Sequence, residues 1–151
     1  MEIKIGLLDN PQVINLLQEH LADMNATSPP ESVHALDVSA LQDERVTFWS
    51  GWKDGKLMGC AAIKRIDVHH VEIKSMRTAS DARNQGVASF MLQFALDFVR
   101  QEGIQQVSLE TGSMAFFAPA RALYEKFGFR YCGPFADYQP DPNSQFMTLT
   151  F

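Results

Sequence analysis

The stretch Arg83-Asn84-Gln85-Gly86-Val87-Ala88 joins an extended segment that ends at Thr78 to a strongly periodic helical segment that runs from Gly86 to about Glu102. The first backbone N–H groups of a helix have no partner inside the helix, and the helix dipole makes that end positive. A tight turn that leads into such a helix therefore favours a bound phosphate. Gly86 lets the backbone approach the ligand, and Arg83 adds a cation. A glycine in an ordinary tight turn before a helix is the alternative interpretation.

The size and composition of the 151-residue chain indicate one globular domain, residues 1–151, because 46% of the residues are hydrophobic and 21% are charged. A net charge of −5 argues against nucleic acid or an anionic membrane as the main partner, since these partners select basic surfaces. The N-terminus lacks the basic region and the long apolar run of a signal peptide, and no apolar stretch is long enough to span a bilayer. We therefore expect a cytoplasmic protein.

Hydrophobic periodicity and turn signals divide the chain into strands and helices. Asn10 is a good helix N-cap, Pro11 is a good first helical residue, and Asp54-Gly55 is the strongest hairpin signal. The predicted helices begin at residues 11, 86 and 119, and residues 31–44 are expected to form a loop with one or two helical turns. The predicted strands are residues 2–7, 46–53, 56–66, 70–78, 105–110, 129–132 and 145–151.

The order of these elements predicts the topology of the sheet. Short turns separate the strands at 46–53, 56–66 and 70–78, so they form an antiparallel meander. The strand at 105–110 follows a helical crossover and should lie parallel to the strand before that helix. The last two strands are expected to form an antiparallel pair. The predicted fold class is α/β, with a mixed central sheet of about six to seven strands and flanking helices.

Two stretches of the sequence carry a resemblance to a known superfamily. The first is Glu72-Ile73-Lys74-Ser75-Met76-Arg77-Thr78 followed by Arg83–Ala88, which fits an acetyl-CoA signature, a strand and then Arg/Gln-x-x-Gly-x-Gly/Ala. The second is Ala120-Arg121-Ala122-Leu123-Tyr124-Glu125-Lys126-Phe127-Gly128-Phe129, which is similar to the helix motif A-x-x-LYEK-x-GF. With the order of elements, these stretches resemble the Gcn5-related N-acetyltransferase (GNAT) superfamily.

The resemblance implies an enzyme that transfers the acetyl group of acetyl-CoA to a primary amine of a small molecule or peptide, by direct attack in a ternary complex and without a metal. In this superfamily the strand at 70–78 splays away from the strand at 105–110. Backbone groups of the first strand pair with the pantetheine arm and polarise the thioester carbonyl, and the turn holds the pyrophosphate. The coenzyme-binding residues that the resemblance implies are Met76, Thr78, Arg83, Gln85, Gly86, Val87, Ala88 and Ser89.

By the same resemblance, Tyr124 is the general acid for the coenzyme A thiolate, although a core tyrosine could occupy the same helix position. Glu72 stands where many members keep a glutamate near the amine, as a base or as an ammonium ligand; a solvated strand-end glutamate is the alternative. Glu110 is expected at the same cleft mouth, and which carboxylate takes the proton stays open. Two carboxylates there would favour a cationic acceptor.

Two other functions stay open from the sequence. One is a non-catalytic sensor that binds an acyl-CoA, and the other is a protein or lysine acyltransferase that uses another acyl-CoA. The presence of Tyr124 together with Glu72 favours catalysis, because a sensor needs neither side chain.

The acceptor side of the site is the least readable part of the sequence. In this superfamily the segment between the first helix and the second strand commonly walls that side, so His34 and Asp37 are expected to contact the substrate unless they lie on a surface loop. Phe117 departs from the family pattern, because many members have there an asparagine that contacts the pantetheine. His69 and His70, in the turn before the fourth predicted strand, are expected to be solvated. The C-terminal strand and the aromatic-rich second strand offer edges that a homodimer could use.

Overall fold

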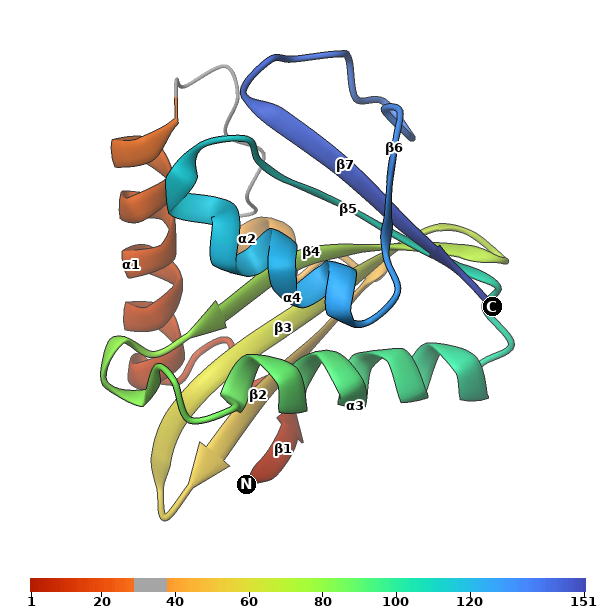
Figure 1. The fold of residues 1–151 in the computed structure, drawn as a ribbon. Coiled ribbons are helices and arrows are strands. Elements are labelled where there is room, and N and C mark those ends of the chain that lie inside the picture. Colours follow the sequence, from red (N-terminus) through yellow and green to blue (C-terminus); the bar gives the residue numbers. More distant parts are fainter. Residues whose placement is uncertain (29–37) are drawn as a thin grey trace.

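The computed structural model describes residues 1–28 and 38–151 and shows a seven-stranded sheet in the order β1-β2-β3-β4-β5-β7-β6 (Figure 1). Strands β4 and β5 pair in parallel, and the other described strand pairs are antiparallel. The predicted α/β class, the meander and the parallel crossover strand are confirmed. The strands are β1 (Glu2–Ile5), β2 (Val46–Lys53), β3 (Lys56–Asp67), β4 (His70–Thr78), β5 (Gln106–Gly112), β6 (Arg130–Cys132) and β7 (Ser144–Thr150).

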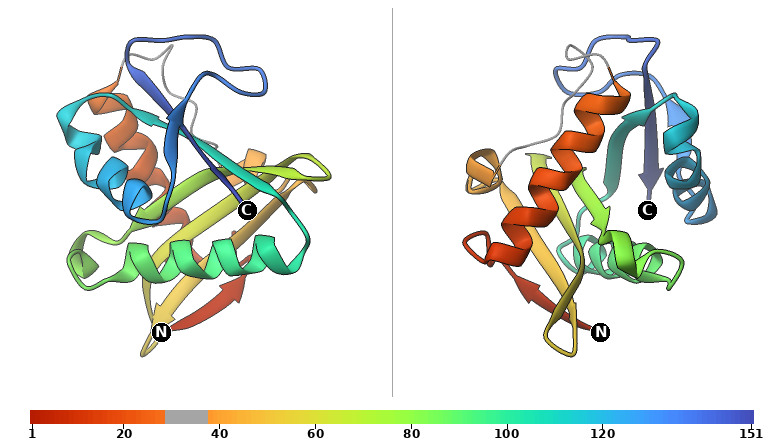
Figure 2. Two further views of the ribbon diagram at one scale, coloured as in Figure 1. Left: turned by 45° about the vertical axis from the view of Figure 1, so that its right-hand side comes forward. Right: turned by 90° about the vertical axis from the view of Figure 1, so that its left-hand side faces the viewer.

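Helices cover both faces of the sheet (Figure 2). On the face that we call the α1 face, Val13, Leu16 and Leu17 of α1 pack on Phe48 and Trp52 of β2. The other face, the α3 face, holds a second buried cluster in which α3 and α4 pack on β3, β4 and β5. The helices are α1 (Pro11–Thr27), α2 (Val38–Leu41), α3 (Val87–Gln101) and α4 (Ala118–Lys126).

Local sequence explains where several elements begin and end. The side chain of Asn10 accepts a hydrogen bond from the backbone N–H of Gln12 at 2.9 Å and so caps α1, as predicted. The first strand ends two residues earlier than predicted, because Gly6 and Leu7 adopt left-handed φ angles of 76° and 70° that end an extended strand.

The parallel pair of strands separates along its length. β4 and β5 are paired only from His70–Gln106 to Ile73–Leu109, although β4 continues to Thr78 and β5 to Gly112. Beyond that point β5 stays paired with β7 and β4 with β3. The two strands therefore splay apart as expected, and the edge of β4 that faces β5 has no partner among the described strands.

A bulge in β4 decides which side chains face which layer. Ile63 of β3 pairs with Ile73, but the preceding residue Ala62 pairs with Ser75, so Lys74 is the extra residue. Strand alternation therefore reverses after Lys74. Ser75 and Arg77 then face α1, whereas regular alternation would have placed them on the same face as Ile73.

His69 is exposed, as expected, but His70 at the start of β4 is half-buried, so the expectation that it is solvated is only partly met. The Nε2 atom of His70 lies 2.7 Å from the hydroxyl of Ser108 on β5, and the ring packs beside Phe135. Burial is the main cause that lowers the pKa of His70. The parallel pairing of β4 with β5 brings these residues together.

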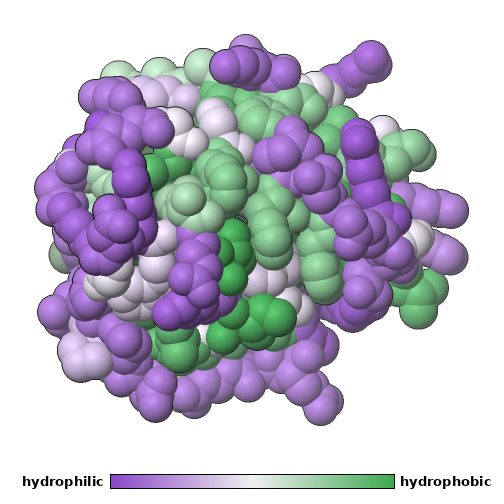
Figure 3. Space-filling model, turned by 90° about the horizontal axis from the view of Figure 1, so that it is seen from below, coloured by the Kyte–Doolittle hydropathy of each residue, from purple (hydrophilic) through white to green (hydrophobic). Residues whose placement is uncertain are grey.

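The face seen in Figure 3 carries apolar side chains across its centre and hydrophilic side chains around its edge. Phe90, on the exposed side of α3, is one of the large hydrophobic residues that remain accessible. Within residues 1–28 and 38–151, no helix combines the length and the apolar character needed to cross a membrane.

Close packing at the end of β5 gives a first prediction. A Cβ atom added at Gly112 would lie 2.1 Å from the Phe117 ring, so Gly112→Ala must displace that ring. We expect the substitution to lower the free energy of unfolding by about 1–3 kcal/mol. Gly133→Ala is the control, because nothing lies within 4 Å of its added Cβ atom. Equal urea midpoints for the two variants would contradict the prediction.

Candidate active site

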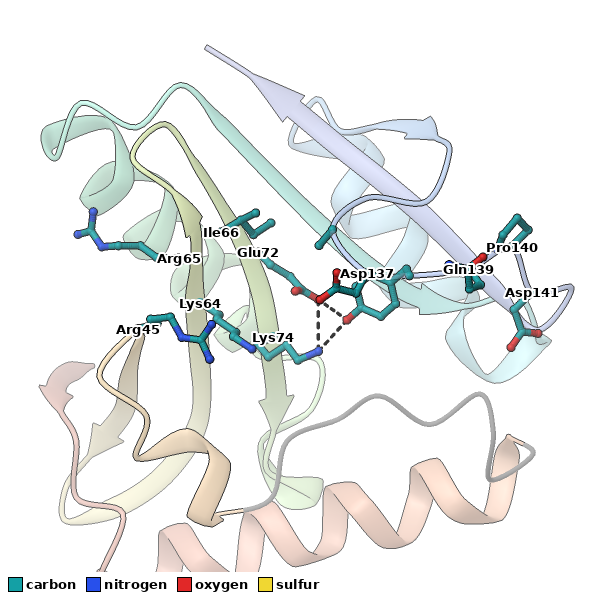
Figure 4. A pocket seen from close by; sticks show the side chains of 12 residues that line it. Arg45, Lys64, Arg65, Ile66, Glu72, Lys74, Asp137, Gln139, Pro140 and Asp141 are labelled. Atoms are coloured by element: carbon teal, nitrogen blue, oxygen red, sulfur yellow. Dashed lines mark hydrogen bonds and ion pairs between the residues drawn. The ribbon is translucent and has the colours of Figure 1, made fainter.

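Three cavities lie in a row where β4 and β5 separate. The helix-side cavity, 530 Å³, is bounded by the N-terminus of α3, β4, α4 and α1. The loop-side cavity, 760 Å³, lies between β3, β4 and the loop at 136–141 (Figure 4). The junction cavity, 100 Å³, joins them, because it shares Met76, Phe117 and Tyr124 with the first and Glu72 and Tyr138 with the second.

The N-terminus of α3 forms one end of the helix-side cavity. Gly86 caps the helix with a left-handed φ of 79°, and the space beside it is open, since nothing lies within 4 Å of an added Cβ atom. No side chain caps the helix, and its first backbone N–H groups have no hydrogen-bond partner within the helix. With Arg83 in the wall, this end has the polarity that favours a phosphate.

Most of the predicted coenzyme-binding residues line this cavity, and one does not. The Gln85 side chain is turned away and donates to the backbone oxygen of Asp81 at 3.4 Å, while Asn84 lines the cavity in its place. The predicted residues that line the helix-side cavity are Met76, Thr78, Arg83, Gly86, Val87, Ala88 and Ser89.

Tyr124 on α4 lies where the helix-side and junction cavities meet. Its side chain is buried against Phe129, and its hydroxyl lies 4.0 Å from the sulfur of Met76. Burial raises the pKa of Tyr124 to about 12, so the hydroxyl keeps its proton at neutral pH. A protonated hydroxyl that faces a cavity is suited to donate a proton.

Glu72 on β4 is buried, and it lies where the junction and loop-side cavities meet. The interpretation as a solvated strand-end residue is therefore wrong. The hydroxyl of Tyr138 donates to Oε2 of Glu72, and Nζ of Lys74 lies 3.4 Å from the same oxygen. Nζ of Lys74 also donates to the Tyr138 hydroxyl at 2.7 Å, and Figure 4 shows the three groups converging. No hydrogen bond or ion pair to Oε1 is found among the described residues.

The second predicted carboxylate, Glu110 on β5, also lines the junction cavity. Its Oε2 accepts a hydrogen bond from the hydroxyl of Ser144 at 2.7 Å. Ser75 lines the same cavity from β4, and its buried hydroxyl has no hydrogen-bond partner among the described residues. A buried hydroxyl without a partner is costly, so this cavity favours a polar ligand.

The structure adds residues to the candidate site to which the sequence analysis assigned no individual role. Tyr138 and Lys74 belong to the group around Glu72, and His20 of α1 lines both the helix-side and the junction cavities. No motif marks Tyr138 or His20, since each reaches the site through the packing of a separate element. Lys74 lies within the quoted strand signature, but its position beside Glu72 follows from the bulge in β4. The predicted acceptor residues His34 and Asp37 lie outside the described residues.

Phe117 replaces the expected asparagine and closes one wall. Its buried ring packs against Gly112 and lines both the helix-side and the junction cavities. Its ring offers an apolar surface there. Among the side chains of residues 1–28 and 38–151 that the structure describes, no group of three or more His, Cys, Asp or Glu residues is arranged to hold a metal ion.

His20 is kept neutral by its surroundings. Burial lowers its pKa to about 4, the charge of Arg77 adds to the effect, and Asp23 opposes it. Arg77 also fixes α1 beside β4, because its Nη2 lies 2.9 Å from Oε1 of Glu19 and 2.6 Å from Oδ2 of Asp23. A neutral imidazole therefore lines the cavities at physiological pH.

This shift predicts a pH dependence of stability. Because the folded-state pKa of His20 lies near 4 and the unfolded value near 6.5, the unfolded chain binds the extra proton between these values, and stability falls as pH falls through that window. His20→Gln should reduce the loss of unfolding free energy between about pH 7 and about pH 5 by about 1–2 kcal/mol. His69→Gln, at an exposed histidine, is the control. Urea unfolding at the two pH values gives the free energy of unfolding of each variant. If this free energy falls between the two pH values as much in His20→Gln as in the wild type, the assignment is contradicted.

Comparisons with known proteins point to one family. The family model described as "Acetyltransferase (GNAT) family" matches residues 13–129. The uncharacterised N-acetyltransferase YsnE of Bacillus subtilis is 53% identical over 98% of both chains, and YedL of Escherichia coli, named in the same way, is 46% identical over 98% of this chain and 93% of its own. The structure of a Klebsiella pneumoniae protein described as an acyl-CoA N-acyltransferase superposes with a TM-score of 0.82 at 27% identity and covers 99% and 96% of the two chains.

These matches extend over nearly the whole chain, as does the agreement in fold. The protein is an acyltransferase of the N-acetyltransferase class. The chain belongs to the GNAT family.

Proposed function

We propose that this protein transfers the acetyl group of acetyl-CoA to a primary amine, with the coenzyme in the helix-side cavity and the amine in the loop-side cavity. The observation that carries the proposal is the row of three cavities, which joins a phosphate-type helix end to a buried carboxylate through a narrow junction. Tyr124 faces the junction from the helix side and Glu72 from the loop side.

The chain offers groups that suit each part of coenzyme A. The N–H groups of Val87, Ala88 and Ser89, with Arg83 beside them, would hold the pyrophosphate. The edge of β4 that faces β5, from Lys74 to Thr78, has backbone groups that would pair with the pantetheine arm as an added strand would. When bound, acetyl-CoA supplies the activated acetyl group and a thiolate leaving group.

The residues of the junction would handle two of the protons of the reaction. An ammonium acceptor must lose one proton before its nitrogen can attack, and Oε1 of Glu72 would accept it while Tyr138 and Lys74 hold Oε2. The nitrogen loses a second proton to water as the amide forms. The departing thiolate must gain a proton, and the hydroxyl of Tyr124, whose pKa is raised by burial, would donate it. The chain thus accepts one proton on the loop side and gives one on the helix side.

Direct transfer also agrees with the positions of the two cysteines. Cys60 is buried on the α1 face, and burial raises its pKa to about 12, so its thiolate is scarce at neutral pH. Neither Cys60 nor Cys132 lines the three cavities. A covalent acetyl-cysteine therefore has no support in this arrangement, which favours attack by the amine within a ternary complex.

Initial-rate kinetics tests the proposal. Acetyl-CoA is mixed with a panel of primary amines, thiol release is followed, and each acetylated product is identified by mass. Double-reciprocal plots that intersect are expected for a ternary complex, whereas parallel plots and an acetylated protein would overturn direct attack. Saturable binding of coenzyme A with no thiol release across the panel would support the alternative of a non-catalytic sensor. Faster thiol release with a longer acyl-CoA than with acetyl-CoA would show that the transferred acyl group is not acetyl.

A further inference from the structure

The wall of the loop-side cavity has a charge pattern that the reaction itself does not require. The cations Arg45, Lys64, Arg65 and Lys74 line this cavity, although the chain as a whole has a net charge of −5. The acidic residues Asp137 and Asp141 line it from the loop. In Figure 4, Arg45 and Lys64 extend toward the same space as Lys74, whereas Arg65 points away. The cations that face the cavity thus gather on the strand side.

Lys64 is the central residue of this wall. It lies directly opposite Glu72 in the pairing of β3 with β4, so both side chains stand on the α1 face. Lys64 is half-buried, and no carboxylate of residues 1–28 and 38–151 lies within ion-pair distance of its ammonium group. Lys74, in contrast, is occupied by Glu72 and Tyr138.

Arg45 adds a cation that is already partly neutralised. Its Nε and Nη2 lie 3.1 Å and 3.0 Å from the two carboxylate oxygens of Asp43. Asp43 also attracts Lys64 without lying within ion-pair distance of it. The strand side of the cavity therefore offers the charge of Lys64 and the remaining donors of Arg45. This net charge of about +1 matches a carboxylate better than a doubly charged phosphate.

We propose that the acceptor is an amine that also carries a carboxylate group, and that Lys64, assisted by Arg45, binds this carboxylate while the amine faces Glu72. This inference rests on the proposed function. It replaces the sequence-based expectation of a simply cationic acceptor, because it adds an anion-binding end to the cavity. Size does not limit the choice, since a cavity of 760 Å³ is large enough for an amino acid or a short peptide.

The test compares acceptors that differ only in charge. γ-Aminobutyrate and its carboxamide have the same length and the same amine, so a carboxylate site should give the first a KM about tenfold lower at similar kcat. Lys64→Gln should remove most of this difference in KM. Lys53→Gln, at an exposed lysine on the neighbouring strand β2, should leave the difference in KM intact.

The possible outcomes separate this inference from the proposed function. Acetylation of both acceptors with equal KM would overturn the carboxylate site and leave the transferase intact. A preference for phosphoethanolamine over ethanolamine that is larger than the preference for γ-aminobutyrate over its carboxamide, and that is lost in Lys64→Gln, would show a phosphate site instead. Calorimetric titration of the γ-aminobutyrate pair tests binding without turnover. If γ-aminobutyrate binds no more tightly than its carboxamide, the inference is wrong even if no acceptor is acetylated.

Discussion

Tyr124→Phe is expected to lower kcat for acetyl transfer by about 10²–10⁴-fold, because it removes the hydroxyl that would protonate the departing thiolate and keeps the ring that packs on Phe129. Binding of coenzyme A should change little, because the contacts expected for the pyrophosphate lie on α3. Steady-state rates of thiol release give kcat, and calorimetry gives the dissociation constant of coenzyme A.

Tyr131→Phe is the matched control for this substitution. Tyr131 lies on β6, is half exposed and is outside the three cavities, so its loss should leave kcat unchanged. A Tyr124→Phe enzyme with wild-type kcat would remove Tyr124 from the chemistry and leave it as a core residue. Equal thermal midpoints of the two variants would show that the comparison concerns the reaction and not folding.

Glu72→Gln is expected to lower kcat/KM by about 10²-fold or more near neutral pH, since an amide cannot accept the proton of an ammonium acceptor. The deficit should narrow as pH rises, because a growing fraction of the acceptor is then already deprotonated. The measurement is kcat/KM against pH for one acceptor. A deficit that stays constant at all pH values would indicate that Glu72 orients the site without taking the proton.

Glu110→Gln decides between the two carboxylates of the junction cavity. Glu110 is held by Ser144 on β7, whereas Glu72 borders the loop-side cavity through which we expect the amine to enter. A smaller loss is therefore expected for Glu110→Gln. A larger and pH-dependent loss in that variant would assign the base to Glu110. The double variant Glu72→Gln/Lys74→Gln shows whether an unpaired Lys74 contributes to the effect.

Sequence patterns predicted the elements well, because they depend on neighbours along the chain. The apolar stripe of α3, the cap at Asn10 and the hairpin at Asp54-Gly55 are local signals, and each is found where it was expected. The predicted phosphate turn also has local causes, since Gly86 adopts the left-handed conformation that a residue with a side chain rarely adopts. Seven of the eight predicted coenzyme-binding residues line the helix-side cavity.

The bulge at Lys74 shows why alternation alone could not describe β4. With a strict two-residue period, Ser75 and Arg77 would share a face with Ile73, yet the extra residue turns them toward α1. Arg77 can then bind Glu19 and Asp23, and Met76 packs with the core on the side of Tyr124. The bulge depends on pairing with β3, which no pattern within β4 encodes.

The sequence by itself determined the fold class, the turn that precedes α3, and the candidates Tyr124, Glu72 and Glu110, since periodicity, glycine conformation and two motifs are properties of short segments. Only the tertiary structure decided the composition of the acceptor side. Tyr138 comes from a loop, His20 from α1 and Lys64 from β3, and they meet at the junction or the loop-side cavity because the sheet order and the splay of β4 from β5 bring these elements together. Contacts between residues so distant in sequence arise from packing, so no local pattern specifies them.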